Sequence, residues 1–204
     1  MTDQLLPHFI IIGAMKSGTP TLYRHLDDHP DVDMSRDKET DFFVSEKNWS
    51  RGLEWYSRQF SRADAVRGEA SPNYSKSRDF PGVPDRIAQF CPVAILIYIL
   101  RDPVDRAQSQ FNHSVVMGGL SPDIDNFKSS HEYAHILDVS RYAEQLEKFC
   151  EHFDSEAILV LDFAELVSSP QAVMDKVTAH IGVDARAITS LDANNDSSEV
   201  SKVP

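Results

Sequence analysis

Short apolar runs alternate along this chain with segments whose apolar residues recur at helical spacing. Runs such as "PHFIIIG" at residues 7–13 and "VAILIYIL" at residues 93–100 are rich in β-branched residues, which indicates buried strands. The segments between them keep apolar residues on one face, as Leu22 and Leu26 do, which indicates amphipathic helices. The pattern predicts strands at residues 7–13, 65–74 (ending in a polar turn), 93–100 and 157–163, and helices at residues 19–30, 51–60, 83–90, 104–116, 140–153 and 169–183.

Proline, serine and glycine mark several of these boundaries. Pro20 suits the first turn of its helix, because the N–H that proline lacks has no partner there, and Pro30 ends that helix. In the last helix, Ser169 is expected as the cap, Pro170 as the first residue and Gly182 as the end. The segments predicted to be irregular or mobile are residues 31–50, 118–126 and 194–204.

Strands that alternate with helices predict right-handed βαβ crossovers. The fold class is therefore α/β, with a mainly parallel central sheet flanked by helices. We expect residues 1–204 to form a single domain, because no linker or internal repeat interrupts the pattern. Ligands of such sheets bind at the carboxyl ends of the strands, so we expect the site in the loops that follow Gly13 and Leu100.

The first of these loops, "GAMKSGTPTL", has a P-loop-like layout: a strand, a glycine-containing loop and a helix start. A nucleotide triphosphatase loop places Lys directly after its last Gly, whereas Lys16 here lies two residues before Gly18. N–H groups near Gly18, Thr19 and Thr21 are expected to face an anion that the helix dipole stabilises, and Lys16 adds a full charge. The alternative, a tight turn with an exposed lysine, explains the glycine but not the whole pattern. The predicted anion-binding residues are Lys16, Ser17, Gly18, Thr19, Pro20 and Thr21.

The second loop, "YILRDPVDRAQSQF", carries another candidate anion site. Arg101 lies at the strand end, and Ser109 lies about two helical turns further on, roughly on the face of the helix start. Arginine binds phosphate bidentately, and a serine hydroxyl adds a hydrogen bond. Alternatively, Arg101 forms a surface ion pair with Asp102 or Asp105, which explains "RDP" equally well on its own. Two anion sites at neighbouring strand ends indicate one ligand with two separated phosphate groups.

Charge and composition limit the classes of partner. The net charge of −12 argues against nonspecific binding to nucleic acid or polyanionic sugars. No run approaches the roughly 18 apolar residues of a membrane helix, and the N-terminus lacks a secretory signal. We therefore expect a cytoplasmic protein with no membrane partner, or a chain from which a targeting segment has been removed. Two cysteines, Cys91 and Cys150, are too few for a disulfide framework or a cysteine-based metal site.

Together, these motifs resemble the sulfotransferase family that uses 3′-phosphoadenosine 5′-phosphosulfate (PAPS). "GAMKSGTPTL" is similar to the family's loop for the 5′-phosphosulfate, and "RDPVDRAQS" to its 3′-phosphate motif, with Arg101 and Ser109 in the binding positions. "KETDFF" (38–43) and "GEASPNY" (68–74) resemble segments of the branch that includes heparan sulfate sulfotransferases and many bacterial enzymes. The resemblance covers about residues 8–183 in order.

The resemblance implies in-line transfer of a sulfuryl group from PAPS to a hydroxyl or amine of a small-molecule or saccharide acceptor. The product is adenosine 3′,5′-bisphosphate (PAP), and no metal is required. Lys16 then stabilises the leaving phosphate, and Glu39 of "KETDFF" takes the acceptor proton. Glu39 has a second interpretation as an exposed carboxylate paired with Lys38. His113, four residues after Ser109, is the reserve base.

Further positions concern the acceptor and the departures from the family. The predicted acceptor-pocket residues are Phe42, Ser71 and Tyr74, with core packing or a turn as their alternative roles. Pro20 replaces a second hydroxyl residue in the loop, and Val44 stands where the animal heparan enzymes carry an acidic residue, which disfavours a heparan-like acceptor. Chains of the family continue beyond the last predicted helix, so we expect the C-terminal part of this domain to be incomplete.

Two other functions remain open. A P-loop kinase using ATP is disfavoured by the displaced Lys16 and by Arg101, which ends a strand where a metal-binding Asp is expected. A catalytically inactive module that binds PAP is permitted by Pro20, Val44 and the expected early C-terminus. Binding of PAP without magnesium, with no binding of ATP, distinguishes the sulfotransferase from the kinase. A sulfate-transfer screen distinguishes the enzyme from the inactive module.

Overall fold

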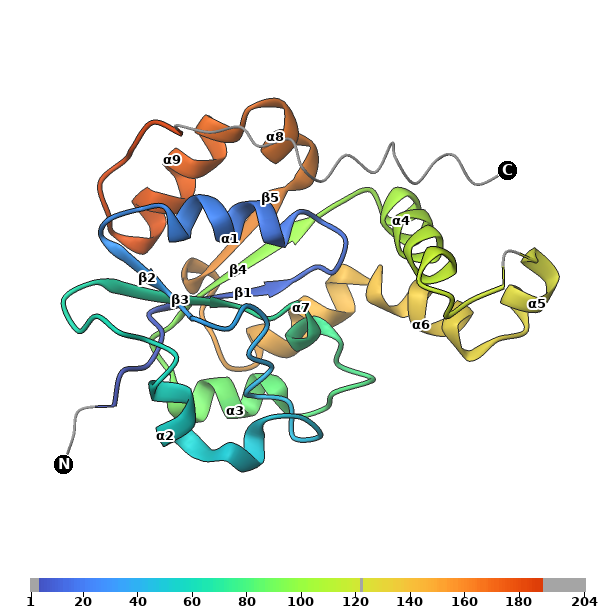
Figure 1. Ribbon diagram of the computed structural model, residues 1–204, viewed down its shortest axis with the longest axis horizontal. Helices are drawn as coiled ribbons and strands as arrows, with labels where there is room; N and C mark the ends of the chain where they lie inside the picture. The colour runs from blue at the N-terminus through green and yellow to red at the C-terminus, as the bar shows by residue number, and fades with distance from the viewer. Residues whose placement is uncertain (1–3, 122, 189–204) are drawn as a thin grey trace.

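The computed structural model describes residues 4–121 and 123–188, with a sheet of five strands at its centre (Figure 1). The spatial order is β2-β3-β1-β4-β5, and every pairing is parallel. The strands are β1 (Phe9–Gly13), β2 (Val32–Met34), β3 (Val66–Ala70), β4 (Ile95–Leu100) and β5 (Ile158–Asp162). The predicted α/β fold with a parallel sheet is confirmed. The segment at 194–204, predicted to be mobile, lies outside the described residues.

Alternate side chains of β1 point to opposite faces of the sheet, and each face buries its own core. Phe9 and Ile11 join one core, and Ile10 and Ile12 join the other. Helices α1 (Thr19–Asp27), α8 (Phe163–Ser168) and α9 (Pro170–Ile181) cover the first face, and α2 (Gly52–Ser57), α3 (Val83–Phe90) and α7 (Tyr142–Cys150) cover the second (Figure 1). Helices α4 (Pro103–Val116), α5 (Ile124–Lys128) and α6 (His131–Val139) extend to one side. Two covered faces explain why β1 is apolar throughout.

Several elements differ from the sequence prediction. Strand β2 lies inside residues 31–50, which were expected to be irregular, because three residues are too few to show a period. Helix α5 begins inside the predicted loop 118–126, and α6 was not predicted at all. Helix α8 begins at Phe163, the last residue of a predicted strand, since the Asp162 carboxylate accepts the Ala164 N–H at 2.8 Å and starts a helix there.

Caps were predicted with mixed success. Ser169 occupies the N-cap position of α9 as predicted, but among the described residues its side chain makes no cap hydrogen bond. Pro170 lies in the first turn of α9, and Gly182 ends the helix in the left-handed conformation with a φ of 78°, both as predicted. Pro20 likewise lies in the first turn of α1.

The strand order brings the carboxyl ends of β3, β1 and β4 side by side. Ile11 of β1 pairs with Ala70 of β3, and Gly13 of β1 pairs with Tyr98 of β4. The chain leaves β1 towards β2 and β3 on one side, and later crosses to β4 on the other side. This reversal is a switch point, where α/β sheets bind their ligands, so the loops after these three strands converge on one site.

Candidate active site

The loop between β1 and α1 presents unpaired backbone N–H groups. In the described part of the chain, the N–H groups of Lys16, Gly18 and Thr19 have no protein acceptor. The Thr21 N–H, expected to face the anion, donates to the Gly18 carbonyl at 3.0 Å instead. Lys16 and Gly18 are left-handed, with φ angles of 65° and 84°. Free N–H groups at such a turn and at a helix start form a cradle for an anion.

Two cations lie next to this cradle without a carboxylate between them. The Arg101 guanidinium donates to the Lys16 carbonyl at 3.3 Å. Burial and then the positive charge of Arg101 lower the pKa of Lys16. Neither side chain forms an ion pair with any described carboxylate. Adjacent like charges repel each other, and anionic groups bound beside them reduce that repulsion.

Two buried polar atoms at the same place lack a hydrogen-bond partner among the described residues. They are the Ser17 hydroxyl oxygen and the Arg101 Nε. The Arg101 guanidinium lies 4.7 Å from the Phe163 ring centroid, and the Tyr142 hydroxyl donates to the Arg101 carbonyl at 2.9 Å, so the arginine is held from two sides. An unpaired buried donor costs about 1–3 kcal/mol. These atoms therefore fit a phosphate or sulfate group, which accepts from several donors at once.

Helix α4 extends the site beyond Arg101. The Asp102 carboxylate accepts two N–H groups of the first turn, at 2.9 and 3.0 Å, and caps the helix rather than pairing with Arg101. Ser109 is half-buried on α4, and His113 is exposed one turn further along the same face. Partial burial and then the charge of Lys16 lower the pKa of His113, so its ring lies near Lys16 and is neutral at pH 7.

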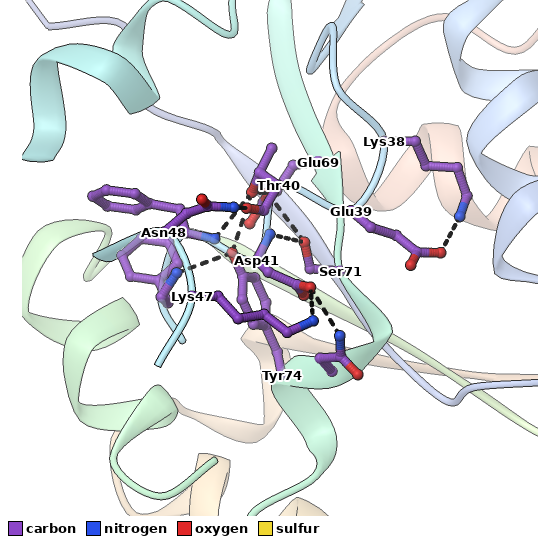
Figure 2. A network of polar contacts seen from close by, with 12 residues as sticks. Lys38, Glu39, Thr40, Asp41, Lys47, Asn48, Glu69, Ser71 and Tyr74 are labelled. Atoms are coloured by element: carbon purple, nitrogen blue, oxygen red, sulfur yellow. Dashed lines mark hydrogen bonds and ion pairs between the residues drawn. The ribbon is translucent and has the colours of Figure 1, made fainter. Parts of the chain in front are cut away.

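Glu39 lies beside the carboxyl end of β3, so the loop between β1 and α1 separates it from Arg101 at the end of β4. Its N–H donates to the Ala70 carbonyl at 3.0 Å, and its side chain is 44% exposed. The carboxylate is ion-paired with Lys38, as the second interpretation of this residue expects. Figure 2 shows both side chains directed away from the buried groups beside them. A ligand can therefore reach this carboxylate, and its role as a base stays a prediction.

The three side chains predicted to line an acceptor pocket lie in the interior. Phe42, Ser71 and Tyr74 are each 0% exposed. Phe42 stacks on Tyr56 with ring centroids 4.3 Å apart, so it belongs to the aromatic core, its alternative role. The pocket assignment therefore needs correction. These side chains pack or hydrogen-bond behind the site, because apolar contacts and backbone donors hold them there.

The sequence reasoning missed a buried polar cluster behind Glu39 (Figure 2). Glu69 is 0% exposed, and a carboxylate oxygen of it accepts the Thr40 hydroxyl proton. Asp41 is ion-paired with Lys47 and accepts a hydrogen bond from the Asn73 amide at 2.8 Å. The signal was present in "GEASPNY", where a glutamate lies inside an otherwise small and apolar strand.

Lys76 is a second buried ionisable group that was missed. It follows the short 3₁₀ helix η2 (Pro72–Ser75) and is 6% exposed. Burial lowers the pKa of Lys76 to about 8, while the charges of Asp79, Asp41 and Glu39 act in the opposite direction. Its ammonium group therefore lies within reach of the carboxylates of the "KETDFF" segment.

The donor set suits an anionic ester better than a metal ion. Within residues 4–121 and 123–188, no three His, Cys, Asp or Glu side chains form a group that could hold a metal. No helix in the same ranges is both long and apolar enough to cross a bilayer. Cationic side chains, hydroxyls and free N–H groups are the usual partners of phosphate and sulfate. The requirement for a metal stays untested.

A parallel sheet with a phosphate-type loop at its switch point defines a P-loop-like α/β protein. A family model described as "Sulfotransferase domain" matches residues 6–200, so this chain belongs to the sulfotransferase family. The chain is 29% identical over 191 residues to the bifunctional heparan sulfate N-deacetylase/N-sulfotransferase 1 of Caenorhabditis elegans, covering 87% of this chain and 22% of that protein. It is 31% identical over 190 residues to human heparan sulfate glucosamine 3-O-sulfotransferase 3B1, covering 87% of this chain and 46% of that protein. The chain thus spans less than half the length of either relative.

Solved structures show the same fold. A sulfotransferase from Alicyclobacillus acidocaldarius superposes with a TM-score of 0.81 at 27% identity, covering 93% of this chain and 87% of that chain. A mouse sulfotransferase solved in complex with PAP superposes with a TM-score of 0.55 at 19% identity, covering 89% of this chain and 60% of that chain. The family expected from the sequence motifs is confirmed.

Proposed function

We propose that this protein transfers a sulfuryl group from PAPS to a hydroxyl or amine of a small-molecule or saccharide acceptor and releases PAP. The observation that carries the proposal is the pair of cations, Lys16 and Arg101, which no described carboxylate neutralises and which lie beside the free N–H groups of the loop after β1. Glu39 lies at the end of the neighbouring strand β3. The two halves of a transfer site, an anion cradle and an accessible carboxylate, thus share one edge of the sheet.

The chemistry assigns a different role to each group. The acceptor oxygen or nitrogen forms a bond to sulfur while the bond between sulfur and the bridging oxygen of PAPS breaks, and the electron pair stays on the leaving phosphate. Lys16 and the loop N–H groups stabilise that developing charge. Glu39 takes the proton that the acceptor loses, and His113, neutral and near Lys16, is the reserve base. Arg101 and Ser109 bind the second phosphate of the nucleotide.

The acceptor is proposed by class only. Relatives named for heparan sulfate support a saccharide hydroxyl or amine, whereas the net charge of −12 disfavours a long polyanionic chain. Val44 stands where the resemblance to the animal heparan enzymes places an acidic residue, and its side chain is 0% exposed in the core. This position therefore offers no acidic side chain to an acceptor. A neutral sugar, a phenol or a small amine fits these observations better. The sequence-based expectations of a cytoplasmic location, and of no nucleic-acid or membrane partner, remain proposals.

Binding of PAP tests the cofactor half directly. Excess PAP without magnesium is expected to raise the melting temperature, because a ligand that binds only the native state stabilises it. The variants Lys16→Ala, Arg101→Ala and Ser109→Ala are each expected to reduce that shift. Lys148→Ala is the matched control, since this lysine pairs with Glu151 on the exposed surface of α7. If all three site variants respond to PAP as wild type does, the cofactor site is elsewhere.

Transfer itself separates the remaining functions. A screen with ³⁵S-labelled PAPS against 4-nitrophenol, methyl glucoside and glucosamine is expected to yield a labelled product. Stabilisation by ATP with magnesium, and not by PAP, points to the kinase. Stabilisation by PAP with no transfer to any phenol, sugar or amine, in the longest natural form of the chain, points to the inactive binding module.

A further inference from the structure

Residues 38–43, which carry the proposed base, form no helix or strand, yet side chains hold their backbone. Three consecutive N–H groups, those of residues 41–43, donate to hydroxyl oxygens at 3.0, 3.3 and 3.2 Å. The hydroxyls belong to Ser71, Thr40 and Tyr74 in that order. Side chains thus replace the backbone partners of a regular element, and they set the shape of this turn.

The Thr40 hydroxyl connects the turn to the end of β3. It donates to a carboxylate oxygen of Glu69 and accepts the Phe42 N–H (Figure 2). A threonine hydroxyl has a single proton, so donation to Glu69 directs its lone pairs towards Phe42. The Asn48 amide donates to the Thr40 carbonyl at 2.7 Å and holds the same residue from the other side.

Glu69 is expected to destabilise the fold at this position. It is 0% exposed, it forms no ion pair with a described basic side chain, and its second carboxylate oxygen has no hydrogen bond among the described residues. Burying a carboxylate without a cation destabilises a fold, and an apolar side chain of this length packs a core better. Residues that break a packing rule in this way concentrate at functional sites.

We infer that Glu69 is a positioning residue, which acts through Thr40 to hold the turn that presents Glu39 to the acceptor. Glu39 and Asp41 on either side of Thr40 have φ angles of 62° and 46°, a left-handed conformation that residues with a Cβ adopt only when surrounding contacts enforce it. The Thr40 bond to Glu69 lies between these two residues and is such a contact. The inference rests on the proposed function, in which Glu39 is the base.

Amide hydrogen exchange tests the inference without an acceptor. Thr40→Val keeps the shape of the side chain and removes its hydroxyl, and it is expected to speed exchange of the Phe42 and Phe43 amides roughly tenfold. Thr40→Ser restores the hydroxyl and is expected to exchange as wild type does. Thr178→Val is the matched control, because Thr178 is equally buried and bonds only within α9. If Thr40→Val exchanges like the control, Thr40 does not hold the turn and the inference is wrong.

Turnover tests the link to catalysis, with ³⁵S-labelled PAPS and the best of 4-nitrophenol, methyl glucoside and glucosamine. Glu69→Met removes the acceptor atoms and Glu69→Gln keeps one. We expect kcat to fall roughly tenfold in Glu69→Met, to stay near wild type in Glu69→Gln, and KM for PAPS to stay unchanged in both. The double variant Glu69→Met with Thr40→Val is expected to be no worse than either single variant, as for one coupled unit.

The outcomes distinguish the two proposals. Full turnover in Glu69→Met and Thr40→Val, together with loss of turnover in Glu39→Gln, overturns the positioning role and leaves the proposed function intact. Full turnover in Glu39→Gln overturns the role of Glu39 as the base. In that case, loosening of the turn by Thr40→Val still supports a structural link from Glu69 to residues 38–43.

Discussion

The described residues other than glycine that have a positive φ angle are Lys16, Glu39 and Asp41. All three belong to the motifs that meet at the carboxyl ends of β1 and β3. Each left-handed residue with a Cβ costs roughly 1–2 kcal/mol, so the strain of the backbone is concentrated at the candidate site. Strain of this kind persists where surrounding contacts enforce it, which agrees with a preorganised anion cradle and a presented carboxylate.

Lys16 and Glu39 are predicted to affect different steps. Glu39→Gln keeps the size of the side chain and removes its basic oxygen, so turnover is expected to fall on the order of a hundredfold. The affinity for PAP is expected to be unchanged, because the proposed role of Glu39 concerns the acceptor and not the nucleotide. Lys16→Ala is expected to reduce both, since its charge acts on the bound nucleotide and on the leaving oxygen. Isothermal titration with PAP and initial rates with PAPS measure the two effects.

His113→Ala is the informative comparison for that experiment. If Glu39→Gln keeps full turnover and His113→Ala loses it, the base is His113. Its lowered pKa and its position near Lys16 make it able to accept a proton at neutral pH.

The sequence predicts three of the candidate residues, Lys16, Arg101 and Ser109, because they follow a local pattern of a strand, a loop and the start of a helix. Glu69 and Lys76 were not predicted, because their character depends on burial by segments distant in sequence. Burial raises the pKa of Glu69 to about 7 and lowers the pKa of Lys76 to about 8. A sequence shows only that these residues are charged, and charged residues are mostly exposed.

At the scale of elements, most periodic segments were predicted, whereas β2, α5, α6 and α8 were missed. The 14 residues of α4 show an amphipathic pattern, whereas the three of β2 and the five of α5 are too short to show one. Helix α5 is held at its start by Asp123, whose carboxylate accepts two backbone N–H groups at 2.9 and 3.1 Å. Side-chain caps of this kind form short helices that periodicity does not reveal.

Gly18 is predicted to be required where α1 begins. It has a φ of 84°, and an added Cβ lies 3.0 Å from two ring carbons of Phe163, the ring that supports the Arg101 guanidinium. Gly18→Ala is therefore expected to lower the melting temperature and to weaken PAP binding. Gly118→Ala is the matched control, since Gly118 has a φ of 75° and no atom of the described residues lies within 4 Å of an added Cβ. It is expected to cost about 1 kcal/mol in urea unfolding and to leave PAP binding intact. Equal PAP affinity in both variants contradicts the prediction.

At the scale of the whole molecule, the class of fold was predictable because strands and helices alternate in the sequence. The strand order was not, because periodicity shows which segments are strands but not which strands pair. In the order β2-β3-β1-β4-β5, Glu69 lies on β3 behind the candidate site and is fully buried. Its burial makes its contribution to the free energy of unfolding depend on pH.

The contribution of Glu69 to the free energy of unfolding is predicted to fall as the pH rises from 4.5 to 7. Burial raises the pKa of Glu69 from 4.5 to about 7, with the charge of Asp41 acting in the same direction and the hydrogen bond from Thr40 opposing it. In this window the folded chain binds more protons at Glu69 than the unfolded chain does, so this contribution to stability is lost as the pH rises. The loss is about 3 kcal/mol.

Urea unfolding of wild type and Glu69→Gln between pH 4.5 and 7.5 measures this difference. The free energy of unfolding of Glu69→Gln, relative to that of wild type, is expected to increase as the pH rises. The Glu147→Gln control, at an exposed position, is expected to show the same pH dependence as wild type. Lys76 titrates nearer pH 8 and is outside most of this window. Parallel curves for wild type and Glu69→Gln contradict a raised pKa of this carboxyl.

The two cations of the site are 85 residues apart in the chain and meet only because β4 docks against β1. Contacts of such long sequence separation form late in folding, since a long loop must close first. In a chain that is still on the ribosome, β1 has emerged before β4 docks against it. The loop after β1 then carries Lys16, but Arg101 is not yet in place beside it. In the proposed function, the nucleotide therefore binds tightly only to chains whose central strands have assembled. Its presence during synthesis acts against partly folded forms, which are the forms that aggregate and are degraded.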